Sequence, residues 1–298
     1  MLNLLKILIH SNIFISLAAV SLTIATQIQL GMAPQWHPYL FIIFFATLFE
    51  YNIHRLITVI KNKDALDTEK HGWVKNNLYK FYLLVFLSVA GFLSVAFLAK
   101  KEVLIALAPI AVLTILYSLP FFEGEKIIFR LRDIPFLKIF LIAFVWSVST
   151  ILLPVIQSGI SFKKIDIVTM LLERFLFIFA ITIPFDIRDM KDDRQAGLKT
   201  IPLILGEKAA LIIAYIALFS FFVISFIHYN QLQSWFIVYA LSLSAVTTFY
   251  FLKSKKIRAL RFYHYGILDG TMLLQGLLVL FFYYGKIKFR DLKIESTA

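Results

Sequence analysis

Four acidic residues lie within eight positions directly after a long apolar stretch. If a helix continues through them, Asp186, Asp189 and Asp193 share one face, because each residue turns a helix by about 100°. The same spacing places Arg188 and Asp192 off that face. Three convergent carboxylates repel one another unless a cation neutralises them, and oxygen ligands without cysteine or a histidine pair favour Mg²⁺. We therefore predict that Asp186, Asp189 and Asp193 bind Mg²⁺.

Basic residues occur just beyond this cluster and in another loop on the same predicted side. Mg²⁺ in proteins typically joins one or two carboxylates to the phosphates of a substrate, so we expect a diphosphate ligand. Lysine and arginine side chains bind phosphate oxygens. The candidates for this contact are Arg194, Lys199, Lys126, Arg130 and Arg132. The alternative is that these charges form an ordinary solvated loop of a membrane protein.

The elements that must position these residues are membrane-spanning helices. The chain has 298 residues, 60% of them hydrophobic, and its mean hydropathy is +0.82, whereas a soluble domain devotes far more sequence to polar surface. Stretches of roughly 20 apolar residues, long enough to cross the hydrocarbon core, recur along the chain. No segment alternates as an outer-membrane barrel strand does. The sequence predicts an all-α, polytopic membrane bundle around a central cavity.

Charge and cysteine usage exclude several classes of protein. The net charge is +12, but the lysines and arginines are scattered among loops and do not form the continuous stripe of a nucleic-acid-binding protein. We expect membrane lipid and no nucleic acid among the partners. Cysteine is absent, which excludes disulfides and cysteine-based zinc or iron–sulfur sites.

We predict about nine transmembrane helices in a single domain, residues 1–298, because no linker rich in Gly, Pro or Ser divides the chain. The predicted spans are 7–33, 38–60, 78–99, 102–121, 136–157, 166–187, 208–229, 232–252 and 262–284. The distribution of basic residues favours a cytoplasmic N-terminus in an inner or plasma membrane, with the aspartate cluster on the cytoplasmic side. The basic C-terminal tail points to the opposite orientation.

The stretch Asp186–Pro202 closely resembles the second aspartate-rich motif, with its trailing Asp-Arg-x-x-Gly-x-x-Thr/Ser-x-Pro, of the UbiA-type intramembrane prenyltransferases, which include 4-hydroxybenzoate polyprenyltransferases. The stretch Tyr117–Pro120, at the end of the fourth predicted helix, resembles that family's tyrosine-containing loop. The family has nine helices. The resemblance implies transfer of a prenyl chain from a prenyl diphosphate to a lipophilic acceptor, with Mg²⁺ bound by aspartates.

The family's first motif, Asn-Asp-x-x-Asp-x-x-x-Asp, is expected at the end of the second predicted helix. Only Asn52 matches it there, and the positions of its aspartates hold Ile53, Leu56 and Ile60, none of which binds a metal ion. We predict that Arg55 replaces one metal ion by placing a fixed positive charge on the diphosphate, with Asn52 as a polar contact. The alternative is that Arg55 is an interfacial residue at a helix end.

Other polar residues are candidates on weaker grounds. Glu50 and His54 flank the degenerate first motif and could supply further polar contacts. Asp269 is an acid inside the last predicted span, and an intramembrane acid is a functional candidate by default. His37 and His228 lie near the opposite membrane face, so we expect them to be structural.

The predicted reaction begins when Mg²⁺ and basic side chains draw charge from the bridging oxygen, so that the allylic C–O bond ionises and an acceptor attacks. Asp186, Asp189 and Asp193 hold the metal, and Tyr117 stabilises or positions the reacting end. An aromatic or quinone-precursor acceptor is one candidate. Three alternatives stay open: a non-catalytic descendant that binds a prenyl lipid, an intramembrane terpene cyclase and, less favoured, a transporter. Prenyl chain length and oligomeric state are left undetermined.

Overall fold

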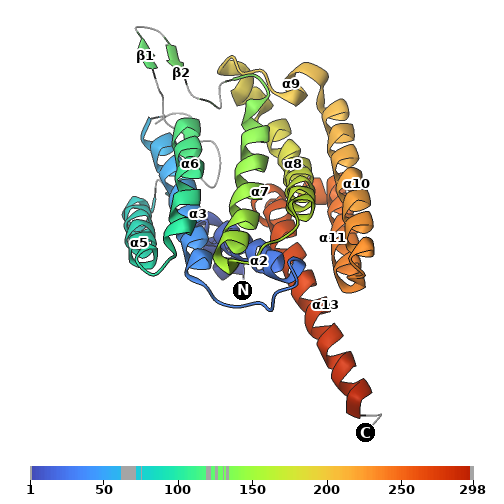
Figure 1. Ribbon diagram of the computed structural model, residues 1–298. Coiled ribbons are helices and arrows are strands. Elements are labelled where there is room, and N and C mark those ends of the chain that lie inside the picture. The colour runs from blue at the N-terminus through green and yellow to red at the C-terminus, as the bar shows by residue number, and fades with distance from the viewer. Residues whose placement is uncertain are drawn as a thin grey trace.

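A computed structural model describes residues 2–61, 72–74, 76–118, 122–124, 127–129, 131 and 134–295. Over these residues the chain is a bundle of helices (Figure 1), which confirms the predicted all-α class. The long helices are α2 (Ile13–Gln29), α3 (Pro38–Lys61), α5 (Leu78–Ala96), α6 (Lys101–Ser118), α7 (Leu137–Ser158), α8 (Lys164–Gln195), α10 (Glu207–Gln231), α11 (Trp235–Lys253) and α13 (Asp269–Glu295). The short elements are α1 (Leu2–His10), β1 (Phe122–Gly124), β2 (Ile127–Phe129), α9 (Ile201–Leu205), α12 (Lys255–Arg258) and the π-helical turn η2 (Tyr263–Leu268).

Each of the nine predicted spans overlaps one of these long helices, but the count of nine is not confirmed. Within the described residues, seven helices are long and apolar enough to cross a membrane, and the bent pair α1–α2 raises the number to eight. Helix α6 ends at Ser118, and the next residues, 119–121, lie outside the described part of the chain. Large apolar side chains cover the outer surface of the bundle, as a lipid-facing surface requires.

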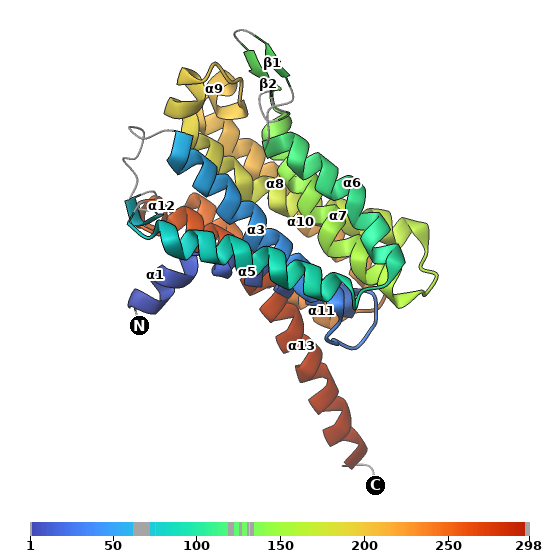
Figure 2. The same cartoon turned by 90° about the vertical axis from the view of Figure 1, so that its left-hand side faces the viewer.

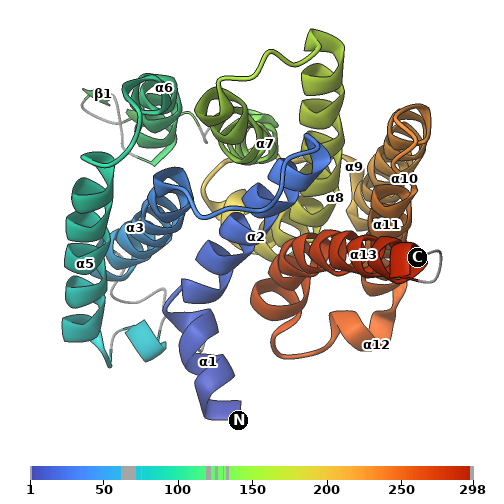
Figure 3. The same ribbon diagram turned by 60° about the horizontal axis from the view of Figure 1, so that its bottom comes forward.

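Helices α2, α3, α7, α8, α10, α11 and α13 form a closed ring, and α5 and α6 are attached outside it. Helix α2 packs against α3, α7 and α13, and the ring continues from α7 through α8, α10 and α11 back to α13. Helix α5 packs on α3, and α6 packs on α7 (Figures 2 and 3). Gly276 lets α13 approach α2 closely, because a Cβ at this position would lie 2.0 Å from Ser21 Oγ. The C-terminal part of α13 projects beyond the bundle (Figure 1).

The first predicted span, 7–33, is wrong as a single helix. Helices α1 and α2 meet at an angle of 78°, because Asn12 adopts a left-handed conformation with φ of 62°. Asn52 stabilises the break: its Nδ2 donates to the Ser11 carbonyl at 3.0 Å, and its Oδ1 accepts from Asn12 Nδ2 at 3.0 Å. Inside a bundle such groups must find protein partners, because lipid offers none.

Helix α8 continues through the aspartate cluster, as the spacing predicts, and ends directly after it. Gly197 follows the helix with φ of 71°, a conformation that glycine adopts without steric cost. The Leu198 amide donates to the Asp193 carbonyl at 2.9 Å, and the Gly197 amide to Arg194 at 3.1 Å. This is a Schellman termination, which satisfies the last carbonyls of the helix. It holds the acidic turn in helical geometry.

Candidate active site

A cavity of about 490 Å³ lies at the end of the bundle where α8 terminates. Its wall comes from the ends of α3, α6 and α8, the beginning of α7, and the turn η2 with the first residues of α13. Its charged lining residues are Glu50, Arg55, Lys138, Asp186, Arg188, Asp189, Asp192, Asp193 and Asp269. Segments far apart in the sequence therefore bring their ionisable residues to one enclosed space.

The predicted carboxylate face exists, and a lysine ammonium lies at its centre. Lys138, in the first turn of α7, places Nζ 2.9 Å from Asp186 Oδ1 and 3.2 Å from Asp193 Oδ2. The nearest oxygen of Asp189 is 3.8 Å away. Asp186 and Asp193 are buried. A buried carboxylate needs a cation or hydrogen-bond donors to offset its lost hydration, and Lys138 provides that charge.

Arg188 neutralises the third carboxylate. Its Nε donates to Asp189 Oδ1 at 2.7 Å, and its Nη2 donates to Asp189 Oδ2 at 3.0 Å. The sequence places Arg188 and Asp192 off the shared face, yet both line the cavity. Arg188 reaches the cavity because its long side chain extends around the helix, and Asp192 reaches it because the cavity is wider than one helical face.

Two arginines that line the cavity, one on α3 and one on α8, pack on one tyrosine of η2. The guanidinium carbons of Arg55 and Arg188 lie 5.5 and 4.8 Å from the ring centre of Tyr265, within the range of cation–π contacts. Nε and Nη1 of Arg55 are buried and meet no hydrogen-bond acceptor among the described residues. Buried N–H donors without acceptors are costly, so the Arg55 guanidinium, at the wall of the cavity, has unmet hydrogen-bonding capacity.

Several other candidate residues line the cavity, and some do not. Tyr117, Glu50, His54 and Asp269 line the cavity. Arg194 and Lys199 are exposed and do not line it. Lys126, Arg130 and Arg132 lie outside the described residues.

Asn52 is a special case because its carboxamide is already engaged. It is fully buried and donates to the carbonyls of Ser11 and Leu48, at 3.0 and 2.8 Å. With its Oδ1 accepting from Asn12, the side chain is occupied at the helix break, and it does not line the cavity. The arrangement supports a structural role for Asn52.

The carboxylate face does not fit a Mg²⁺ ion at its centre. An ion there would need oxygens at about 2.1 Å, but the ammonium of Lys138 fills that position and Arg188 holds both oxygens of Asp189. Across the part of the chain that the structure describes, no three acidic or histidine side chains are arranged to hold a metal ion.

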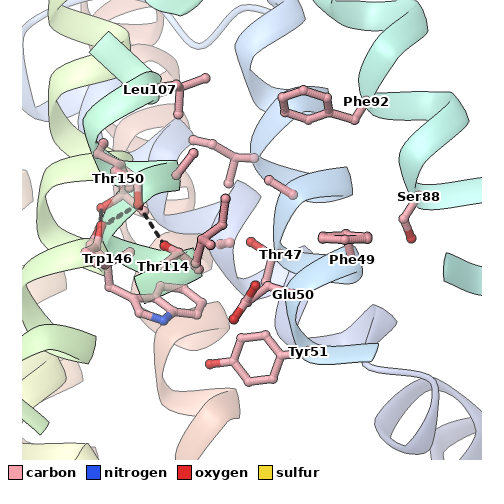
Figure 4. A pocket seen from close by; sticks show the side chains of 18 of the residues that line it. Thr47, Phe49, Glu50, Tyr51, Ser88, Phe92, Leu107, Thr114, Trp146 and Thr150 are labelled. Atoms are coloured by element: carbon pink, nitrogen blue, oxygen red, sulfur yellow. Dashed lines mark hydrogen bonds between the residues drawn. The ribbon is translucent and has the colours of Figure 1, made fainter. Parts of the chain in front are cut away.

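A second, apolar cavity of about 360 Å³ adjoins the first. The two share the wall residues Glu50, Tyr51, Thr114, Val145 and Trp146. Figure 4 shows Glu50, Tyr51 and Trp146 at one end of this cavity, with Phe92 and Leu107 toward the other. Its lining comes mainly from α3, α5, α6 and α7. A polar compartment therefore opens beside an apolar one.

Sequence reasoning missed three residues of the site: Lys138, Arg188 and Tyr265. The available signal for Lys138 was its position one residue inside an apolar span, where an ionisable group needs a partner. No sequence signal marks Tyr265, because its position follows from the π-helical turn before α13.

Comparison with known families gives one match. The sequence pattern of the UbiA prenyltransferase family matches residues 76–265. The match begins after the end of α3, the segment in which the first aspartate motif is degenerate. No curated protein matches the chain.

Solved structures share the fold at low sequence identity. A UbiA homolog from Archaeoglobus fulgidus bound to GPP and Mg²⁺ aligns with a TM-score of 0.62 and 15% identity, over 92% of this chain and 99% of that one. A digeranylgeranylglyceryl phosphate synthase gives 0.55 and 16%, over 94% and 98%. The apo form of a UbiA homolog from Aeropyrum pernix K1 gives 0.55 and 14%, over 92% and 97%.

Proposed function

We propose that this chain, which belongs to the UbiA prenyltransferase family, transfers a prenyl group from a prenyl diphosphate to a lipophilic acceptor within the membrane. The observation that carries the proposal is the pair of adjoining cavities. One has buried arginine N–H groups without acceptors, and the other is almost wholly apolar. The positive-inside distribution supports a cytoplasmic opening of the charged cavity.

The two compartments match the two ends of a prenyl diphosphate. The diphosphate needs charge-assisted hydrogen bonds, which Arg55 of α3 and Lys138 of α7, both lining the charged cavity, can donate. The prenyl chain needs apolar surface, which Phe92 and Leu107 provide beyond the shared wall. Structures of Archaeoglobus fulgidus homologues with GPP or DMAPP support this class of donor.

The proposed reaction depends on stabilising the leaving group. The allylic C–O bond breaks, its electron pair stays on the diphosphate oxygen, and Arg55 and Lys138 stabilise the charge that develops there. The nucleophilic atom of the acceptor then attacks the carbocation and releases a proton. Tyr117 and Tyr265, which line the same cavity, position the reacting end through their aromatic rings.

Mg²⁺ is the cofactor that the sequence predicts, and the homologue complexes with Mg²⁺ support a divalent ion in those proteins. In this chain the carboxylate face does not fit that ion, and the proposed reaction uses side-chain cations there. Asp186, Asp189 and Asp193 instead orient Lys138 and Arg188 toward the cavity.

Product analysis tests the proposal. Purified protein in lipid nanodiscs, incubated with GPP, farnesyl diphosphate or longer donors and a lipid extract, should release diphosphate and form prenylated products detectable by mass spectrometry. Asp193→Ala should abolish release, because Lys138 loses one of its two nearest carboxylates. Glu207→Ala is the matched control, since Glu207 is an exposed acid outside the cavity. It should keep wild-type rates.

The outcomes separate the alternatives. Donor binding without diphosphate release would identify a non-catalytic prenyl-lipid-binding protein. Diphosphate release with a cyclised hydrocarbon and no acceptor adduct would identify a terpene cyclase. Wild-type rates in Asp193→Ala would remove the carboxylate face from the mechanism. Donor flux across proteoliposomes without chemistry would identify a transporter.

A further inference from the structure

The carboxylate face of α8 already contains its cation, and that cation belongs to the chain. Lys138 Nζ lies within 3.2 Å of both Asp186 and Asp193. The side chain of Lys138 is only 18% exposed, and that of Asp186 is 2% exposed. A second cation at this centre would stand beside the ammonium, and two positive charges a few Å apart repel strongly in a poorly solvated site.

The remaining carboxylate of the face is held by Arg188 through two charge-assisted hydrogen bonds of 2.7 and 3.0 Å. Among the described residues, the three predicted metal ligands therefore contact two side-chain cations, Lys138 and Arg188. On α3, the segment that aligns with the first aspartate motif supplies Arg55 and has no aspartate. A metal ion is expected at the carboxylate face and at the segment of the first motif. The first of these places has the charged side chain of Lys138, and the second has that of Arg55.

We infer that Lys138 replaces the divalent cation of the carboxylate face, so that Lys138, Arg55 and Arg188 together form a diphosphate site built from side chains. This inference rests on the proposed function for its ligand. It makes Lys138 a diphosphate-binding residue and gives the aspartates a new role. They position an ammonium and do not coordinate a metal ion.

The rival arrangement is a divalent ion that enters with the diphosphate and displaces Lys138. The described lining contains six carboxylates and three arginine or lysine side chains, so it has the negative charge that such an ion would need. The two arrangements differ in one measurable property, which is whether the carboxylate face binds a divalent ion while Lys138 is present.

Mn²⁺ binding, followed by electron paramagnetic resonance on nanodisc-reconstituted protein, tests this without turnover. Wild-type protein should bind no Mn²⁺ at the carboxylate face. Lys138→Met, which keeps the length of the side chain and removes its charge, should gain one bound Mn²⁺, and a second substitution, Asp193→Asn, should abolish it. Lys191→Met is the matched control, because Lys191 is exposed on the acidic turn of α8 and does not line the cavity.

Binding of a non-cleavable geranyl thiolodiphosphate gives the second measurement. Wild-type affinity should change by less than about threefold between EDTA and excess Mg²⁺. Lys138→Met in EDTA should lose about tenfold or more, which corresponds to about 1.4 kcal/mol. Lys138→Arg should retain binding because the charge is kept. A melting curve for each variant identifies any that fail to fold. If Lys138→Met fails to fold, analogue binding by wild-type protein in EDTA and in Mg²⁺ still tests whether the site needs a divalent ion.

Two results would overturn the inference. One is Mn²⁺ bound to wild-type protein and lost in Asp193→Asn, and the other is an affinity of wild-type protein for the analogue that Mg²⁺ raises more than about tenfold over EDTA. Failure of the proposed function looks different. Wild-type protein would then bind no analogue under any condition, while the gain of Mn²⁺ binding in Lys138→Met would still identify Lys138 as the resident cation of the face.

Discussion

Two buried charged clusters include residues of helix α8, one toward each end, and only one of them lines either of the two cavities described above. The second consists of Glu173, Arg174 and His228, roughly 18 Å from Asp186 at about 1.5 Å per residue. Neither cavity described above is lined by these three residues. His228 Nδ1 lies 2.7 Å from Glu173 Oε1, and both side chains are buried.

The difference between the clusters lies in how their cations are satisfied. Arg174 donates to Thr26, Gln29 and the Leu22 carbonyl at 3.1–3.3 Å, and to Thr150 at 3.4 Å. These acceptors come from α2 and α7, so Arg174 joins three helices. At the other end, Arg55 keeps two buried nitrogens without acceptors beside a cavity. Intramembrane charge alone therefore does not identify a ligand site, whereas unsatisfied donors beside a cavity do.

The largest expected effect is on stability, at the Arg174 cluster. Arg174→Met removes the donors of four hydrogen bonds that join α8 to α2 and α7. The free energy of unfolding should fall by about 3 kcal/mol or more, seen as a lower melting temperature in detergent. Lys164→Met, at an exposed position on the same helix, should change it by less than about 0.5 kcal/mol. Unchanged melting of Arg174→Met would end the assignment of this cluster to structure.

Arg55→Ala should act on activity and leave stability almost unchanged. The substitution removes the N–H groups that have no acceptor in the unliganded cavity. We expect kcat/KM for a prenyl diphosphate to fall by about 10²- to 10³-fold, as when one donor to a developing oxyanion is lost, with melting within a few degrees of wild type. Steady-state kinetics of diphosphate release measure this. A drop in melting temperature as large as that of Arg174→Met would show that the two clusters have the same role.

Asn52→Ala tests whether that residue belongs to the helix break or to the ligand. The change leaves the Ser11 carbonyl and the Asn12 amide without their partner. The free energy of unfolding should fall by about 1–3 kcal/mol, and KM for the donor should stay within about twofold of wild type. A KM effect without loss of stability would favour the diphosphate contact predicted from the motif.

The smallest effect should come from the apolar cavity. Ala46→Phe adds a ring to the wall of this cavity and leaves the charged residues in place. KM should rise a few-fold for donors longer than geranyl and stay unchanged for DMAPP, because about 0.8 kcal/mol is lost for each methylene left in water. Competition between donors of different length measures this selectivity. Equal effects on all donors would mean that the prenyl chain lies elsewhere.

The sequence predicted the helical class, the positions of the spans and the continuation of α8 through its acidic turn. These depend on local properties: apolar length, helical periodicity and a glycine that ends the helix. The break at Asn12 escaped prediction, because residues 7–33 read as one apolar stretch and the partner that stabilises the break is 40 residues away.

The sequence by itself determined that Asp186, Asp189 and Asp193 share a face, because a helix fixes the direction of its own side chains. Only the tertiary structure decided what fills that face. Lys138 lies on a different helix, and its ammonium reaches Asp186 only because α7 packs against α8. Packing between distant segments sets which charges meet, and in an enclosed, poorly solvated site that choice decides whether the cation is a metal ion or a side chain.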